Sequence, residues 1–511
     1  MISNMELLKQ RIAIDGRLNM SDIIKSILKD AGDDVKRQYM DIGQRYYDGD
    51  HDVLREDFTS SWVYEDDDHG REKKSLVVND NKSNHHNVHN YHQLLVDQKA
   101  SYIAGKTPTV TVEGAEESSD LKAYENEITT YVDETFADTL IDYITGASNK
   151  GVEYLHFYID PSGKLCYTII PAQEVIAYYD AQYQQNLEAV IRFYSFFVVK
   201  PGGETAERRR VEWWTPQDVT YYTEDDEGNF ILDPDVKRNP APHFWNVTYL
   251  NGSATRREAQ SWGRVPFIPL RNNSSCASDL TRIKGLQDAY NLLSSSSTNN
   301  QIDLVELYWM IQGYGGETAR AIESKLRINK AVSITDPNGR IQAEQVTLAV
   351  GERLEWLKML RKDIYHLGMG MDVDDETFGT APSGIALEFK YELLDQKSDQ
   401  LIRKLQLAMK DFFWFVTKYV NDRNGTAYDS NLVKVTIQKN KHTNDVEKIN
   451  AIMTSRDLVP DKLLLERHPY VDDVNEAIKE LRAQKEEARK DQQALFGSPG
   501  NTPPGGGADE E

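Results

Sequence analysis

The sequence predicts an α+β protein that is built around unusually long helices. Residues 348–367 and 383–420 carry helical patterns, separated by a short acidic segment that contains glycine. At about 1.5 Å per residue the second helix would be roughly 55 Å long, several times the length of an ordinary helix. Residues 152–270 instead alternate short β-branched and aromatic runs with turns, which indicates antiparallel strands joined by hairpins. Helices of this length are typical of struts in an assembly.

The composition describes an acidic chain with few cysteines. It has 511 residues, a formal net charge of −23, and two cysteines, Cys166 and Cys276. Two cysteines provide neither a disulfide framework nor a zinc cage. The acidic balance argues against a surface that grips phosphates, yet it allows a wall that encloses nucleic acid without holding it. The plainer interpretation is that the charge keeps a large assembly soluble.

Length and hydropathy set further bounds. A chain of this length has room for roughly two to four domains. No apolar run approaches the length of a membrane span, so no transmembrane helix is expected. Residues 1–11 have no apolar signal core.

The N-terminal part is predicted to be mostly helical. Residues 20–48 have a helical pattern, and Ser21 is the expected N-cap. Residues 49–84 are polar and rich in turn formers. The elements expected next are a helix from near His89, a short strand at 109–112 and helix over 117–148.

Residues 278–304 are expected to form another long helix, because Leu280, Ile283 and Leu286 fall on helical spacing. The serines at 294–297 would form a small-residue face that lets another helix approach closely. Residues 305–346 then read as a compact unit with strand, helix and strand at 307–311, 318–326 and 331–334. The remaining predictions are a strand at 432–437 that joins the 152–270 sheet, helices over 444–490 and a disordered tail.

Three patterns suggest binding chemistry, and each is incomplete. Gly105-Lys106-Thr107 lacks the earlier glycine of a phosphate-binding loop, since that position is Ala100, and Pro108 obstructs the helix that should follow. The acidic run at 372–376 does not fit the calcium loop of an EF-hand, although a looser cation site stays open.

The third pattern is a histidine cluster. His85, His89 and His92 would share one face of a helix, so a metal site is possible. A hydrogen-bonded helix start is the favoured interpretation. No nucleophile elbow, zincin motif or dinucleotide fingerprint is present, so no enzyme activity, cofactor or metal is expected.

Local motifs support a family resemblance. Residues 46–49 read Tyr-Tyr-Asp-Gly, and residues 95–99 and 102–108 read Leu-Val-Asp-Gln-Lys and Tyr-Ile-Ala-Gly-Lys-Thr-Pro. Residues 263–273 read Gly-Arg-Val-Pro-Phe-Ile-Pro-Leu-Arg-Asn-Asn, ahead of the helix at 278. The order of these motifs and of the elements across residues 40–485 resembles the portal proteins of tailed double-stranded DNA bacteriophages. The resemblance is closer to the branch from long non-contractile-tailed phages of Gram-positive hosts.

The resemblance implies a portal-like ring subunit with an α/β wing, a helical stem, a small α/β clip and a helical crown. The implied parts are an N-terminal arm at 1–19, a wing at 20–277 with strand 432–438, stem helices at 278–304 and 347–367, a clip at 305–346, a tunnel loop at 368–382, a long wing and crown helix at 383–422, a crown at 440–490 and a disordered tail at 491–511.

The resemblance also implies a function and partners. Such proteins form a ring, typically of twelve subunits, around a channel at one capsid vertex, through which DNA is packaged and ejected without sequence specificity. The implied partners are the terminase large subunit, head-completion or adaptor proteins, and capsid and scaffolding proteins. The protein would assemble in the host cytoplasm and reside in the virion.

The tunnel loop is the main candidate site. Its glycines, Gly368, Gly370 and Gly379, allow backbone angles that other residues resist. Its carboxylates, Asp372, Asp374, Asp375 and Glu376, would repel phosphates, and Phe378 could make soft contacts with DNA. Lys358, Arg361 and Lys362 precede the loop as a possible basic ring, or as ordinary stem surface. Tyr308 and Arg327 are the candidate clip contacts.

Two other classes of protein are alternatives. One is a different homo-oligomeric virion protein, such as a capsid or tail-adaptor component, and the other is a cation-dependent nuclease. Electron microscopy separates the first from a portal, and a plasmid-nicking assay tests the second.

Overall fold

The computed structural model describes residues 3–4, 19–66, 72–79, 82–180, 182, 186–199, 203–250, 253–303, 308–312, 340–344, 350–372, 384–441, 445–456, 458–468, 470–471 and 474–496. The chain has two compact units. Unit 1 comprises Met1–Asp372 and Glu392–Asn440, and unit 2 comprises Val373–Tyr391 and Lys441–Glu511. Helices and mostly antiparallel strands occur together, so the predicted α+β class is confirmed.

Unit 1 begins with the short strand β1 (Ser3–Asn4), followed by helices α2 (Met20–Gly32) and α3 (Val35–Tyr47) and the 3-10 turn η1 (Asp52–Arg55). Asn19 caps α2, because its side chain accepts a hydrogen bond from the backbone N–H of Asp22. The expected cap, Ser21, lies inside α2 instead. Its hydroxyl accepts a hydrogen bond from the backbone N–H of Phe230 and so ties the helix to the sheet below.

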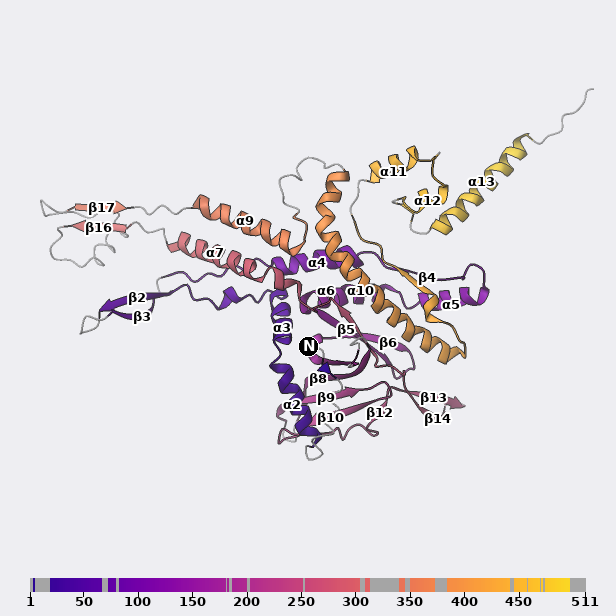
Figure 1. Ribbon diagram of the computed structural model, residues 1–511, viewed down its shortest axis with the longest axis horizontal. Helices are drawn as coiled ribbons and strands as arrows, with labels where there is room; N and C mark the ends of the chain where they lie inside the picture. The colour runs from indigo at the N-terminus through magenta and orange to yellow at the C-terminus, as the bar shows by residue number, and fades with distance from the viewer. Residues whose placement is uncertain are drawn as a thin grey trace, which may run out of the picture. The chain divides into compact units, whose positions relative to one another are not determined.

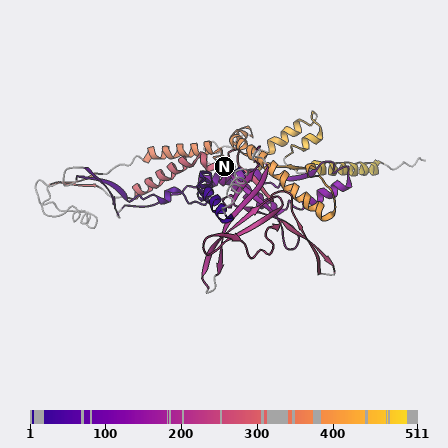
Figure 2. The same ribbon diagram turned by 60° about the horizontal axis from the view of Figure 1, so that its bottom comes forward.

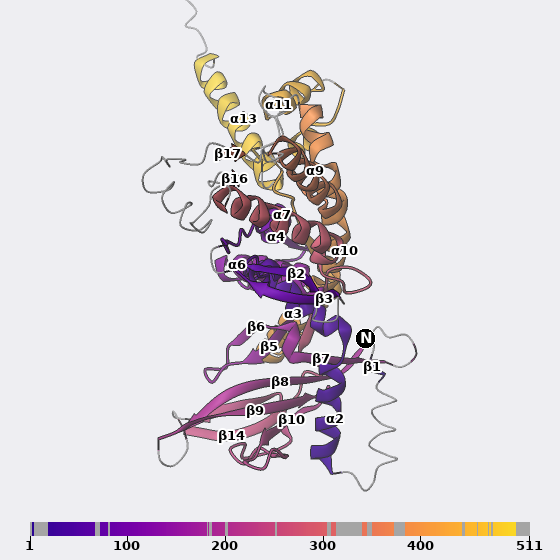
Figure 3. The ribbon, with the colours of Figure 1, turned by 90° about the vertical axis from the view of Figure 1, so that its left-hand side faces the viewer.

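The region predicted to be one antiparallel sheet divides into three. The largest sheet has the order β1-β7-β8-β9-β10-β11, and β12 pairs with β10. Its strands after β1 are β7 (Val175–Tyr179), β8 (Leu187–Val199), β9 (Thr205–Trp214), β10 (Asp218–Glu224), β11 (Phe230–Leu232) and β12 (Ala241–Pro242). Ile24 and Ile27 of α2 pack against Val211 and Trp213 on this sheet, and Figure 3 shows the helix lying beside the strands.

Smaller sheets complete the β structure. A three-stranded sheet has the order β15-β5-β6, and four pairs form separate two-stranded sheets. The 3-10 turn η2 (Ala172–Glu174) follows β6. The strands are β5 (Val152–Ile159), β6 (Leu165–Ile170), β15 (Phe267–Arg271), β13 (Phe244–Leu250) with β14 (Ser253–Gln260), β2 (Ser60–Asp66) with β3 (Glu72–Val78), β4 (Thr109–Val112) with β18 (Val433–Thr436), and β16 (Tyr308–Gln312) with β17 (Arg340–Glu344).

One sequence prediction about strands is wrong, and one hairpin was not predicted. The strand after the long helix, β18, pairs with β4 and not with the 152–270 region. In this pair Val433 lies opposite Val112, and Thr436 lies opposite Thr109. The polar segment at 49–84 is not only turns, since it contains the hairpin β2–β3. The hairpin strands carry many charged and polar residues, which hides the usual apolar alternation of a strand.

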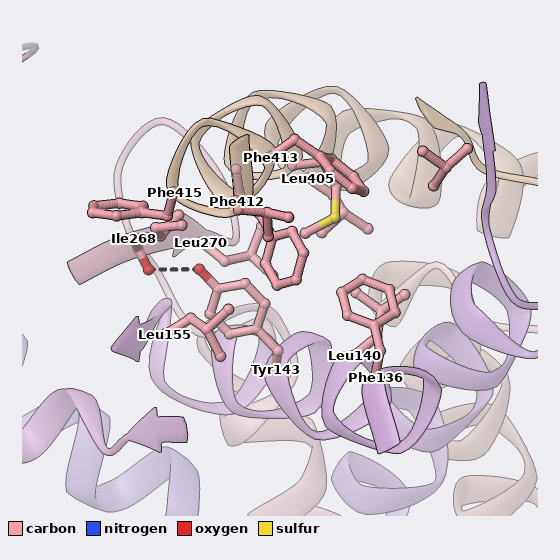
Figure 4. Close-up of a cluster of buried hydrophobic side chains, with 14 of the residues drawn as sticks. Phe136, Leu140, Tyr143, Leu155, Ile268, Leu270, Leu405, Phe412, Phe413 and Phe415 are labelled. Carbon is pink, nitrogen blue, oxygen red and sulfur yellow. Dashed lines mark hydrogen bonds between the residues drawn. The ribbon is translucent and has the colours of Figure 1, made fainter. Parts of the chain in front are cut away.

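The main core of unit 1 lies between helices and the three-stranded sheet. Its helices are α4 (Tyr91–Ala104), α5 (Ser119–Thr129), α6 (Glu134–Lys150) and the C-terminal half of α10 (Gly384–Asn424), which ends before the 3-10 turn η5 (Ser430–Leu432). Phe412 and Phe413 of α10 are buried against Phe136, Leu140 and other residues of α6 (Figure 4). The Tyr143 hydroxyl donates to the Ile268 carbonyl at 2.6 Å, so the buried phenol is satisfied.

Two further helices lie side by side in unit 1, as Figures 1 and 2 show. They are α7 (Lys284–Asp303), which follows the 3-10 turn η3 (Asp279–Arg282), and α9 (Val350–Gly368). Both helices were expected from the sequence. The intervening segment is described only at β16 and β17, so the predicted helix at 318–326 and strand at 331–334 lie outside the described residues.

A polar ladder on α7 binds the extended segment 83–89. Asn299 Oδ1 accepts from the His85 N–H at 2.7 Å, and Asn299 Nδ2 donates to the His85 carbonyl at 3.0 Å. The spacings match, because four helical residues rise about 6 Å and two extended residues about 6.6 Å. The ladder residues are Gln287, Asn291, Ser295, Asn299 and Asp303, which contact every second residue of the segment.

We expect Asn299→Ala to loosen this segment without unfolding the protein. The variant removes both hydrogen bonds to His85, which should cost about 1–2 kcal/mol of local stability. Hydrogen exchange at the His85 amide should therefore rise, whereas the neighbouring Asn300→Ala, outside the ladder, should leave it unchanged. Equal exchange in both variants would show that the ladder does not hold the segment.

Unit 2 contains α11 (Asp445–Thr454), α12 (Asp461–Leu465) and α13 (Val474–Phe496), together with the first residues of α10. The helices predicted over 444–490 are thus present. The disordered tail is predicted at 491–511, but residues 491–496 continue α13; residues 497–511 lie outside the described residues.

Candidate functional site

The connection between α9 and α10 is the candidate functional site, and the structure describes its two ends. The 41 residues of α10 make a helix about 60 Å long. Residues 373–383 lie outside the described part of the chain, so the predicted loop residues Asp374, Asp375, Glu376, Phe378 and Gly379 are not placed. Residues 368–372, which we call the loop root, are described.

The loop root packs tightly against α4. A Cβ atom at Gly370 would lie 2.0 Å from a methyl carbon of Leu95, and one at Gly368 would lie 2.6 Å from another. Neither glycine has a positive φ, whereas Met369 does, at 55°. These two glycines lie in close contact with Leu95 and do not use the positive backbone angles that the sequence suggested. The Gly370 N–H donates to the Tyr365 carbonyl at 2.9 Å and closes the end of α9.

Gln98 of α4 binds the backbone of the loop root with both ends of its amide. Its Nε2 donates to the Met371 carbonyl at 2.9 Å, and its Oε1 accepts from the Met371 N–H at 2.8 Å. Asp372 forms a salt bridge with Arg361 at 2.7 Å. The last two described residues of the loop root are thus held by side chains from two helices, Met371 by Gln98 of α4 and Asp372 by Arg361 of α9.

The three predicted basic residues differ in their surroundings. Arg361 is partly buried, pairs with Asp372 and lies over the ring of Tyr365 at 5.6 Å. Lys358 is exposed and pairs with Glu355 at 3.0 Å, and Lys362 is exposed. Arg361 is therefore committed within its own chain to the loop root. A basic ring formed by these residues stays a prediction.

A charged hub lies where α4, η3 and α10 meet, and it consists of Lys99, Asp279, Lys397 and Asn272. The Asp279 carboxylate lies 3.1 Å from Lys99 Nζ and 3.0 Å from Lys397 Nζ. Lys99 also donates to Asn272 Oδ1 at 2.6 Å. Lys397 donates to the carbonyl of Gly368 at 2.9 Å, where the last carbonyls of α9 carry partial negative charge. The hub therefore links the end of α9 to the body of α10.

Burial and charge shift the pKa values in the hub in expected directions. Burial lowers the pKa of Lys99 to about 8, against the opposing attraction of Asp279. Burial alone would raise the pKa of Asp279, but the charges of Lys397 and Lys99 outweigh it and lower that pKa below its ordinary value. One carboxylate thus compensates two ammonium groups.

The histidine cluster does not form the predicted helical face. Helix α4 begins at Tyr91, so His85 and His89 lie in the extended segment on the polar ladder and only His92 is helical. His92 is fully buried, and burial lowers its pKa to about 4. Within the described ranges, no group of His, Cys, Asp and Glu side chains is arranged to hold a metal ion.

The other residues and motifs predicted from the sequence do not form a site in the described residues. Tyr308 is the first residue of β16, and its side chain is not described; Arg327 lies outside the described residues. α4 ends at Ala104, and Gly105-Lys106-Thr107 leads into β4 rather than into a helix. A helix long and apolar enough to cross a bilayer is absent from the described residues.

Neither the charged hub nor the role of Gln98 is predicted from the sequence. One signal was present, because Lys99 falls on the same helical face as Leu95, Tyr102 and Ile103, all of which are buried. A lysine at a core position of a helix needs an anion nearby. The sequence does not show which of the many carboxylates supplies it.

Comparisons with known proteins agree with this architecture. A family model described as "Phage portal protein, SPP1 Gp6-like" matches residues 28–491. The portal protein of Bacillus phage SPP1 is 29% identical over 406 residues, which cover 79% of this chain and 76% of that protein. The portal protein of Clostridium phage phiCD119 is 26% identical over 463 residues, covering 88% of this chain and 93% of that protein. This chain therefore belongs to the SPP1 Gp6-like family of phage portal proteins.

Proposed function

We propose that copies of this chain form a closed ring, typically of twelve subunits, at one vertex of a phage capsid. Double-stranded DNA would enter the capsid through the ring during packaging and leave through it during ejection. The family match over residues 28–491 carries this proposal. A ring requires a head-to-tail interface whose rotation closes, and long helices such as α7, α9 and α10 are suited to line a channel.

We assign the predicted parts to described elements by their order along the chain. The stem would contain α7 and α9, and the clip would contain β16 and β17. The wing would contain α2 to α6 with the sheets formed by residues 60–271, together with β18. The crown would contain α11 to α13 in unit 2.

The loop between α9 and α10 would line the narrowest part of the channel. Between residues 372 and 376 it carries four carboxylates and no Lys or Arg, so it would repel phosphates and not bind base edges. Twelve copies of a chain with a net charge of −23 would carry roughly −280, which discourages DNA from adhering to the ring.

The partner proteins would bind the ring one after another. The terminase large subunit, which hydrolyses ATP, would dock on the clip during packaging, and head-completion or adaptor proteins would replace it afterwards. Capsid and scaffolding proteins would contact the ring during assembly in the host cytoplasm. The chain itself would be structural, because the sequence lacks a nucleotide-binding loop and a catalytic constellation.

The test is direct imaging of the purified full-length protein. End-on electron micrographs should show closed rings with an axial hole. Solid particles, sheets or open filaments under the same conditions would contradict the proposal. Magnesium-dependent nicking of plasmid DNA by the same preparation would instead favour a nuclease.

A further inference from the structure

The chain passes between the two compact units three times, and beside each crossing a residue of unit 1 is bound by α4. The chain crosses between the units after Asp372, before Glu392 and after Asn440. Gln98 and Tyr102, one helical turn apart, hold the unit 1 side of all three crossings. Gln98 binds Met371 beside the first crossing. The Tyr102 hydroxyl donates to Asp395 beside the second, and its carbonyl accepts from the Asn440 N–H at 2.8 Å beside the third.

The contacts beside the second and third crossings also reinforce each other. Lys439 pairs with Asp395 at 2.9 Å and with Asp399 at 2.7 Å, so one cation bridges two successive turns of α10. Tyr102 is almost fully buried, and its phenol reaches the same Asp395. Residues 439–440 are thus fixed to α10 and α4 before the chain leaves unit 1.

Lys397 links α10 directly to the end of α9. It belongs to α10, yet its ammonium group donates to the Gly368 carbonyl at the end of α9. Its side chain is only 9% exposed, and Asp279 at 3.0 Å compensates its charge. A buried, hydrogen-bonded ammonium has little freedom, because leaving the hub would leave Gly368 and Asp279 without this partner.

We propose that Gln98 and Lys397 are positioning residues for the α9–α10 connection: Gln98 fixes the loop root to α4, and Lys397 fixes the end of α9 to η3 and to the body of α10. Gln98 sets the path of the loop root through the backbone of Met371. Lys397 sets the separation between the end of α9 and the body of α10. The relevance of this positioning to DNA passage rests on the proposed function, whereas the positioning itself does not.

Hydrogen exchange in full-length rings tests the positioning. Gln98→Met keeps the length of the side chain but removes both hydrogen bonds to Met371, so exchange at the Met371 amide should rise about tenfold or more. Lys397→Met should raise exchange at residues 369–371, and the two variants together should give less than the product of their separate effects, because they hold the same root. Gln93→Met, on the exposed face of α4, is the matched control.

The thermal midpoint separates positioning from general stability. Gln98→Met should leave it close to that of the wild type, since Gln98 is only partly buried. A wild-type exchange rate at Met371 in this variant would overturn the proposal, even if Lys397→Met fails to fold. If exchange rises as expected but DNA packaging by the Gln98→Met rings is unchanged, the positioning stands and the role of this connection in DNA passage is contradicted.

Discussion

Asp279→Asn is expected to lower the free energy of unfolding of unit 1 by about 3–5 kcal/mol, the usual cost of removing one partner from a buried ion pair. The side chains of Lys99 and Lys397 are 1% and 9% exposed, and both ammonium groups lie within about 3 Å of the Asp279 carboxylate. Without the carboxylate, two buried positive charges would face each other. Urea denaturation followed by tryptophan fluorescence measures the loss, because Trp262 is buried in the main core of the same unit.

Lys99→Met is the informative counterpart, and it should cost far less. It replaces the most deeply buried charge of the hub with an apolar side chain of similar length, and it leaves Asp279 paired with Lys397. Replacing a buried ion with a well-packed apolar group is often close to neutral. The double variant Lys99→Met with Asp279→Asn should therefore be more stable than Asp279→Asn alone. Additive losses in the double variant would show that the two residues are not energetically coupled.

The pH dependence gives an independent check on Asp279. Its pKa is lower in the folded protein than in the unfolded chain, so its contribution to stability is fully present above the ordinary carboxyl pKa of about 4. The contribution is lost as the pH falls from that value toward the folded pKa. The stability difference between the wild type and Asp279→Asn should thus shrink in acid. A difference that stays constant below pH 4 would contradict the lowered pKa.

The sequence predicts the long elements of this protein well, because their signals are local. The patterns that indicate α7, α9 and α10 repeat over many turns. Each helix can therefore be recognised from its own residues, without knowing which segment packs against it. The family resemblance rests in the same way on runs of neighbouring residues, and the family match confirms it. The boundaries are less accurate, since the N-cap of α2 is Asn19 and Ser21 binds Phe230, more than two hundred residues away.

What the sequence does not predict depends on pairing between distant segments. The serine run in α7 has a partner only because Asn291, Ser295 and Asn299 share a face that matches an extended backbone. Likewise, β18 pairs with β4 across more than three hundred residues. Glycine spacing suggested freedom at Gly370, whereas the contact with Leu95 makes it a point of close packing. In each case the partner decides the role of the residue.

Changing the charge of the loop between α9 and α10 should have the largest effect on function. Replacing Asp374, Asp375 and Glu376 with Lys changes the charge at these positions from −3 to +3 in each subunit. A channel constriction with that charge would hold phosphates, because each lysine contact with DNA displaces counterions and adds affinity. We expect rings to assemble normally and the yield of packaged DNA to fall by about tenfold or more, with partial recovery at higher salt as the contacts are screened.

Two matched variants show whether position or total charge is responsible. The same charge change at Glu480, Glu486 and Glu487 places the lysines on exposed positions of α13, where packaging should be little affected. Replacing the three loop carboxylates with Asn, Asn and Gln removes the repulsion without adding attraction, so its effect should be intermediate. Normal packaging by the loop lysine variant would place the loop away from the DNA path. An equal defect from the α13 variant would instead assign the effect to the net charge of the ring.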